Sequence, residues 1–130
     1  MSTTSDLAAA YVTAAGALDK LYYDLFTKGS TALANQVAQA EANLKQAAST
    51  LATTDALEQL DPTSPDVTTI ANLTDTINKK AAAIQSAENK VSLVTGLAST
   101  LLSTVTDVTA GNIAGGIAAA GQAISDLKQL

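Results

Sequence analysis

The chain has 130 residues, 47% of them hydrophobic, and its 12 acidic and 7 basic residues give a formal net charge of −5. It contains no Cys, no His and no Trp, and every basic residue is Lys. These absences exclude a disulfide framework, a thiolate nucleophile, an imidazole base and the usual transition-metal ligands, and the acidic balance argues against nucleic acid. We expect one domain, 1–130, that is not an enzyme and has no catalytic residue, cofactor or metal site.

The N-terminal segment, 1–6, has no basic residue, and no signal-type apolar stretch follows it. The localisation is therefore unknown, and we expect either a cytoplasmic chain or the mature form of a secreted one. No stretch reaches the roughly 20 uninterrupted apolar residues of a membrane-spanning helix.

The first predicted arm, 5–60, carries apolar residues at alternating steps of four and three, which is typical of one helix face. This face begins with Leu7, Tyr11, Ala14, Leu18, Leu21 and Leu25. Gly29 then predicts a break, with Ser30 as the N-cap of the next helix. The pattern resumes with Leu33, Val37, Ala40, Leu44, Ala47 and Leu51.

A turn is predicted at 61–66, where both prolines of the chain occur. We expect Ser64 to be an N-cap, Pro65 to be the first helical residue, and Asp66 to interact favourably with the helix dipole. The acidic residues of this region lack the spacing of a calcium loop, so we interpret them as capping and solvated groups: Asp55, Glu58, Asp61 and Asp66.

The second predicted arm, 66–130, carries an a/d heptad pattern from Ile70 to Val108, interrupted by Lys80. The a positions are Ile70, Ile77, Ile84, Val91, Ala98 and Val105. The d positions are Leu73, Lys80, Ala87, Val94, Leu101 and Val108. The pattern shifts at Gly111 and resumes with Ile113, Ile117, Ala120, Ile124 and Leu127.

Together these patterns predict an all-α fold built as a long antiparallel helical hairpin. With the turn centred near residue 63, Gly29 would face Gly96 and Gly16 would face Gly111, which would let the arms approach closely. Breaks near Gly29 and Gly111 would instead fold the arms into a four-helix bundle. The sequence leaves open whether these glycines mark kinks or full turns.

The segment 91–125 contains a single charged residue, Asp107. Such a segment is typical of a buried central helix, of a self-associating surface or of a conditional membrane-inserting element. The candidates for self-association are Leu97, Leu101, Leu102, Ile113, Gly115 and Ile117.

The four aromatic residues of the chain fall between residues 11 and 26, and three of them, Tyr11, Tyr22 and Phe26, share one helix face. Tyr23 points elsewhere. We interpret the three residues as a plug for an alanine-rich core, as the aromatic lip of a cavity for a small apolar ligand, or as a docking spot for a partner.

The Ala/Ser/Thr-rich helices and the turn Thr63-Ser64-Pro65 ahead of Leu73-Thr74 resemble fungal cell-wall helical domains of the hydrophobic-surface-binding type. This resemblance covers the middle of the chain and implies amphipathic helices that enclose a fatty acid. The hairpin plan is also similar to small secreted helical-hairpin effectors of bacteria, whose Trp-x-Gly turn is absent here. Neither resemblance assigns the chain to a family.

The leading functional hypothesis is a non-enzymatic structural or interaction protein that self-associates through its Ala/Val/Ile/Leu helical seams, as coiled coils do. Its expected partner is a second copy or another helical protein, with a membrane or lipid as a secondary possibility and nucleic acid excluded. The alternatives are a helical bundle that binds a small apolar ligand of the fatty-acid type and a membrane-active helical protein.

Overall fold

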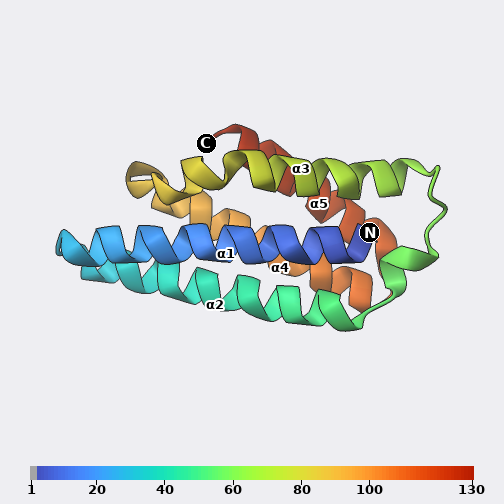
Figure 1. Cartoon of the computed structure of the whole chain (residues 1–130), viewed down its shortest axis with the longest axis horizontal. Coiled ribbons are helices and arrows are strands. Elements are labelled where there is room, and N and C mark those ends of the chain that lie inside the picture. The colour runs from blue at the N-terminus through green and yellow to red at the C-terminus, as the bar shows by residue number, and fades with distance from the viewer. Residues whose placement is uncertain (1–2) are drawn as a thin grey trace.

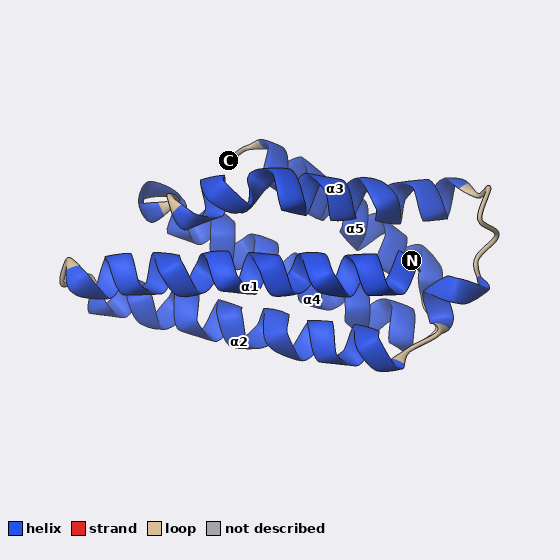
Figure 2. Ribbon diagram, viewed as in Figure 1, coloured by secondary structure: helices blue, strands red, loops and turns tan. Residues whose placement is uncertain are grey.

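The structure is a computed structural model that describes residues 3–130, so Met1 and Ser2 of the predicted domain lie outside the described residues. Over this range the chain forms helices joined by short connections and contains no strand, which confirms the predicted all-α class (Figure 2). The helices are α1 (Thr3–Thr27), α2 (Thr31–Thr53), the 3-10 turn η1 (Ala56–Gln59), α3 (Pro65–Gln85), the 3-10 turn η2 (Glu88–Lys90), α4 (Val91–Thr109) and α5 (Ile113–Lys128).

The α-helices run up and down along one long axis; α1 begins near one end of the bundle, and α5 leads to a C-terminus that lies closer to the middle (Figure 1). Each helix packs mainly against two others, in the circular order α1, α2, α4, α5, α3 and back to α1. The chain therefore forms a five-helix ring, in which α1 and α4 are not principal neighbours. This arrangement replaces the predicted two-armed hairpin and its four-helix variant.

Full turns, rather than kinks, occur at Gly29 and Gly111, whose φ angles are +84° and +87°. The amide of the residue after each glycine donates to a carbonyl five residues earlier: Ser30 to Leu25 at 2.9 Å, and Asn112 to Asp107 at 2.8 Å. This is the Schellman arrangement, which favours glycine because L-residues with side chains rarely adopt these angles.

The expected close approach at paired glycines does not occur. A Cβ atom placed on Gly16, Gly29, Gly96 or Gly111 would meet nothing within 4 Å. Because the arms fold into separate helices, the pairing of positions across one long hairpin is lost.

The predicted start of α3 is confirmed. Ser64 is the N-cap, its side chain accepts from the Val67 amide at 3.4 Å, and Pro65 begins the helix. Ahead of it, the Asp61 carboxylate accepts from the backbone amide of Thr63 at 2.9 Å and from its hydroxyl at 2.8 Å. These bonds, first the backbone one, lower the pKa of Asp61 below its usual range and fix the connection into α3.

A reversal that the sequence did not predict separates α3 from α4 at residues 86–90. The heptad residues on both sides of it remain buried, including Ile84, Ala87 and Val91. The predicted seam is thus divided between two helices that both face the core.

The core consists of one cluster of apolar residues that draws on every α-helix. All six residues predicted for the inner face of α1, from Leu7 to Leu25, are buried. The exception in the first arm is Leu33, which is 38% exposed on the first turn of α2. The connection between α1 and α2 projects beyond the end of α3, which leaves this turn less covered (Figure 1).

Candidate functional site

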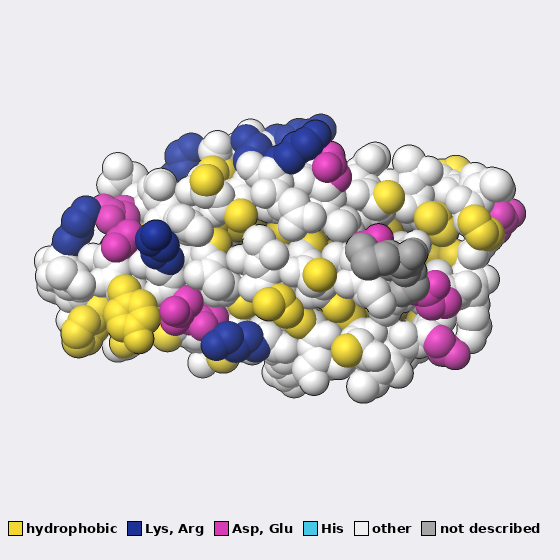
Figure 3. Space-filling view, viewed as in Figure 1, with side chains coloured by type: hydrophobic (Ala, Val, Ile, Leu, Met, Phe, Trp, Pro, Cys, Tyr) yellow, Lys and Arg dark blue, Asp and Glu magenta, His cyan; other side chains and the backbone are white. Residues whose placement is uncertain are grey.

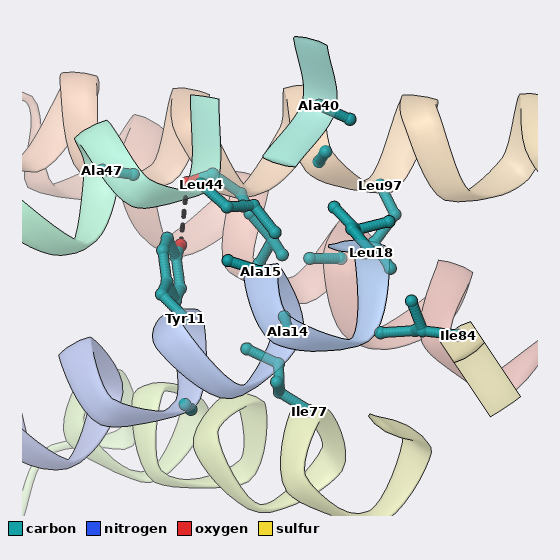
Figure 4. Packing of buried hydrophobic residues seen from close by; sticks show 14 of the residues in the cluster. Tyr11, Ala14, Ala15, Leu18, Ala40, Leu44, Ala47, Ile77, Ile84 and Leu97 are labelled. Atoms are coloured by element: carbon teal, nitrogen blue, oxygen red, sulfur yellow. Dashed lines mark hydrogen bonds between the residues drawn. The ribbon is translucent and has the colours of Figure 1, made fainter. Parts of the chain in front are cut away.

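Tyr11 spans the inside of the ring. Its side chain is fully buried, and its hydroxyl donates to the backbone carbonyl of Leu101 on α4 at 2.7 Å (Figure 4). Burial raises the pKa of Tyr11 far above its usual value, and a hydrogen bond with Thr104 opposes this rise only in part. Uncharged Tyr11 therefore links α1 to α4 by a hydrogen bond, although these two helices do not pack extensively against each other.

The interior of the ring is closed. It holds a void of about 10 Å³ near the middle of the bundle, which is no larger than the space a single water needs. The void is lined entirely by apolar side chains, of which Figure 4 shows several: Ala14, Leu18, Leu44, Ile84, Val94, Leu97, Ala98 and Leu101.

Three aromatic side chains meet near the C-terminal end of α1. The rings of Tyr22 and Phe26 stack with centroids 5.9 Å apart, and the ring of Tyr23 meets Tyr22 edge-on at 5.2 Å. Tyr23 is 60% exposed and Phe26 is 54% exposed, whereas Tyr22 is partly buried. We call these three residues the aromatic patch. Figure 3 shows hydrophobic side chains gathered at this end of the molecule, beside charges of both signs.

The structure separates the three residues predicted to line an apolar-ligand cavity. Tyr11 lies in the core, while Tyr22 and Phe26 belong to the surface patch. Eleven residues of helix place Tyr22 about 16 Å beyond Tyr11 along the axis. α3 ends before α1 does, while α2 continues beside α1 to their connection (Figure 1), so a shared helix face did not produce a shared environment.

The structure also corrects the predicted self-association surface. Leu97 and Leu101 are buried in the core, so the closed bundle does not offer them to a second molecule. Leu102, Ile113 and Ile117 are partly buried and pack against the same core.

Gly115 has a role within the fold. Its amide donates to the side-chain oxygen of Asn112, the N-cap of α5, at 3.0 Å, and a Cβ atom at this position would collide with that side chain. The close approach of α5 to α4 occurs at Gly116 instead, where a Cβ atom would meet the Val108 side chain and, at 3.1 Å, the Thr104 carbonyl.

The helical segment Glu88–Thr109 is long and apolar enough to cross a membrane, with a mean hydropathy of 1.4. Length and composition alone select it, and a core helix of a globular protein meets the same criteria. In this structure 44% of the segment's most apolar stretch is buried, and α4 packs between α2 and α5.

Two acidic residues, Asp6 and Asp75, line an open pocket of about 440 Å³ between α1 and α3, together with Thr3, Thr74 and Asn78. No three Asp or Glu side chains among residues 3–130 are grouped as metal ligands would be. Near the aromatic patch, the Lys28 ammonium pairs with Glu88 at 2.6 Å, and this hydrogen bond raises the pKa of Lys28. The pair joins the α1–α2 connection to η2.

Comparisons of this chain with protein-family models, with curated proteins and with solved structures found no match. The candidate site therefore rests on geometry alone. Sequence reasoning named Tyr22 and Phe26 but placed Tyr23 on a different face, and it did not identify the three as a surface cluster. The signal available was their i, i+1, i+4 spacing next to the Gly29 break.

Proposed function

We propose that this chain is a non-enzymatic interaction protein and that the aromatic patch is its binding surface. The observation that carries the proposal is the exposure of Tyr23 and Phe26, more than half in each case. Tyr and Phe are enriched at the centres of protein interfaces, where a large apolar side chain gains most from losing water.

The geometry of the patch favours binding because its side chains are partly ordered before a partner binds. Tyr22 is anchored by partial burial, and it contacts both exposed rings. Side chains that are ordered before binding lose less conformational entropy on binding. The patch can therefore contribute more affinity than three independent surface rings.

The non-enzymatic part of the proposal is supported by how the titratable groups are distributed. The one strongly shifted pKa belongs to Tyr11, which is sealed in the core and cannot meet a substrate. The smaller shifts, at Lys28, Lys45 and Asp61, arise from surface ion pairs and a turn. Catalytic groups usually combine a shifted pKa with access to a cleft.

The test is retention of the folded chain on a phenyl-substituted agarose column. Tyr23→Ser combined with Phe26→Ser should elute markedly earlier than the unaltered protein. The matched control is Val12→Ser, because Val12 is also 60% exposed on α1 but lies outside the patch. Equal elution of the patch variant and the control, with circular dichroism unchanged, would refute the patch as the binding surface.

A second candidate function is the binding of a small apolar ligand, such as a fatty acid, inside the ring. The observation that favours it is the wholly apolar void where α1, α2, α3 and α4 meet. A void of about 10 Å³ does not hold an aliphatic chain, so binding would require the helices to separate. Of the predicted ligand residues, only Tyr11 lies near this space.

The ligand hypothesis can be tested by thermal unfolding with and without palmitic acid, together with mass spectrometry of organic extracts of the purified protein. A raised melting temperature and co-purified lipid would support it. Ala98→Leu, which adds volume at the void, should reduce the shift. An empty protein with an unchanged melting temperature would exclude this function.

A further inference from the structure

The outward face of α1 carries the patch together with two charged residues. At about 100° per residue, Lys20 and Asp24 lie on one flank of Tyr23 and Phe26 lies about 60° away on the other flank. Lys20, Tyr23, Asp24 and Phe26 are all exposed. Within residues 3–130 neither Lys20 nor Asp24 forms a salt bridge, and Asp24 has only a longer-range attraction to Lys28. Both side chains can therefore form a direct ion pair with a partner.

The positions of Lys20 and Asp24 are self-complementary, because a two-fold rotation brings Lys20 of one copy opposite Asp24 of the other. When two identical helices pack face to face in opposite directions, the same flank of each helix meets. With the axis level with Tyr22, Lys20 of each copy faces Asp24 of the other, because both lie two residues from the axis. Near the axis Tyr23 of one copy lies beside Tyr23 of the other, while Phe26 of each copy lies on the opposite flank, about 6 Å from the axis along the helix.

We infer that the aromatic patch is covered by a second copy of this chain, in an antiparallel α1–α1 contact with two-fold symmetry. This inference rests on the proposed function and names its partner. The contact forms two Lys20–Asp24 pairs along one flank, and it covers Tyr23 at its centre and Phe26 on the other flank. Self-association thus uses the exposed face of α1 and leaves Leu97 and Leu101 in the core.

Charge also distinguishes this occupant from a lipid surface. The chain carries a net charge of −5, which opposes attachment to an anionic bilayer. The same net charge opposes dimerisation at long range, but screening by salt weakens that repulsion, while close pairs within the contact are less affected. The dimer should therefore persist or strengthen at moderate salt.

The experiment is sedimentation equilibrium of the full chain from micromolar to millimolar concentration. The unaltered protein should dimerise, and Lys20→Asp should weaken the dimer about tenfold or more, because two attractive pairs become repulsive. Adding Asp24→Lys to Lys20→Asp should restore the dimer, since the exchanged charges are again complementary.

The matched control is Lys79→Asp. It produces the same net charge as Lys20→Asp, and it acts on an exposed pair, Asp75–Lys79 at 2.9 Å, on α3. This variant should dimerise like the unaltered protein. Equal weakening by both variants would show that net charge alone acts and would overturn the inference.

Two further results would also overturn the inference. One is a strict monomer at every concentration, which leaves the binding surface itself testable by column retention. The other is a monomer that floats with phosphatidylcholine vesicles and loses this property on Phe26→Ser, which would identify a lipid surface as the occupant.

Discussion

Tyr11 and Phe26 lie on one side of the same helix, about 60° apart around its axis, yet Tyr11 is fully buried and Phe26 is 54% exposed. The sequence around Tyr11 carries no charge, whereas Asp24 and Lys28 lie two residues from Phe26. Leu25, at the same level as Phe26, is only 3% exposed, so the helix is still covered on its inner side there, and Phe26 lies outside that covered side.

The comparison shows that the apolar residues of a helix become core only where neighbouring helices cover them. Elsewhere, apolar side chains form a surface whose contact with water costs free energy. In this chain the side of α1 that carries Leu25 is covered to the end of the helix, whereas Tyr23 and Phe26 lie more than half exposed on its outward side. The core and the binding surface are therefore different sides of α1.

The largest effect is expected from a charge placed in the covered region. Leu101→Lys puts an ammonium at a position with 0% exposure, and the cost of burying it approaches the whole stability of a small domain. Circular dichroism should show loss of helicity at room temperature. Ser99→Lys, an exposed position on the same helix, should remain folded; a folded Leu101→Lys monomer would contradict this core.

Truncations compare the two parts of α1 directly. Leu18→Ala should cost about 2–5 kcal/mol of unfolding free energy, as buried leucines do, whereas Phe26→Ala should change the stability of the monomer by about 0.5 kcal/mol or less. Urea denaturation of both variants at low protein concentration measures the contrast. Similar losses at the two positions would mean that Phe26 is covered within the monomer.

A smaller effect is expected from the hydroxyl of Tyr11. Tyr11→Phe removes its bond to the Leu101 carbonyl and should cost about 1 kcal/mol at neutral pH. Because folding raises the pKa of Tyr11, its contribution is present below the usual tyrosine pKa, about 10, and is lost as the pH rises above it. Denaturation at increasing alkaline pH should show this loss in the unaltered protein and a shallower decline in Tyr11→Phe.

The smallest effect is expected at the exposed pair near the patch. Lys28→Met removes the contact with Glu88 and should lower the melting temperature by less than Tyr11→Phe does, because solvent screens exposed pairs. Calorimetry at low and high salt should find that Lys28→Met melts below the unaltered protein only at low salt. A difference that persists at high salt would indicate that the Lys28 side chain contributes by packing.

Most of the core could be predicted because its determinants are local. The four-three spacing from Leu7 to Leu25 identified the inner face of α1, and Ser64 with Pro65 located the start of α3. The reversal after Gln85 could not be predicted in this way. It contains neither Gly nor Pro, and the heptad pattern continues through it without a change of phase.

The candidate site was less predictable because the exposure of its residues depends on how the helices are arranged. A helical pattern places Tyr22 and Phe26 on the side that Tyr11 occupies, and it does not tell where α3 ends beside them. The burial of Leu101 likewise depends on the closure of the ring, which is a property of five helices together. Local sequence identifies which residues form an apolar helix face, and only the tertiary arrangement decides which of these residues are buried.

The placement of the two termini has a mechanical consequence. α1 begins near one end of the long axis, and the C-terminus lies closer to the middle (Figure 1), so a force applied between the start of α1 and the end of α5 acts partly along both helices. Each of these helices would have to slide lengthwise past its neighbours, breaking many side-chain contacts at once rather than peeling away turn by turn. Stretched from its ends, the bundle should therefore resist as a spacer loaded in shear.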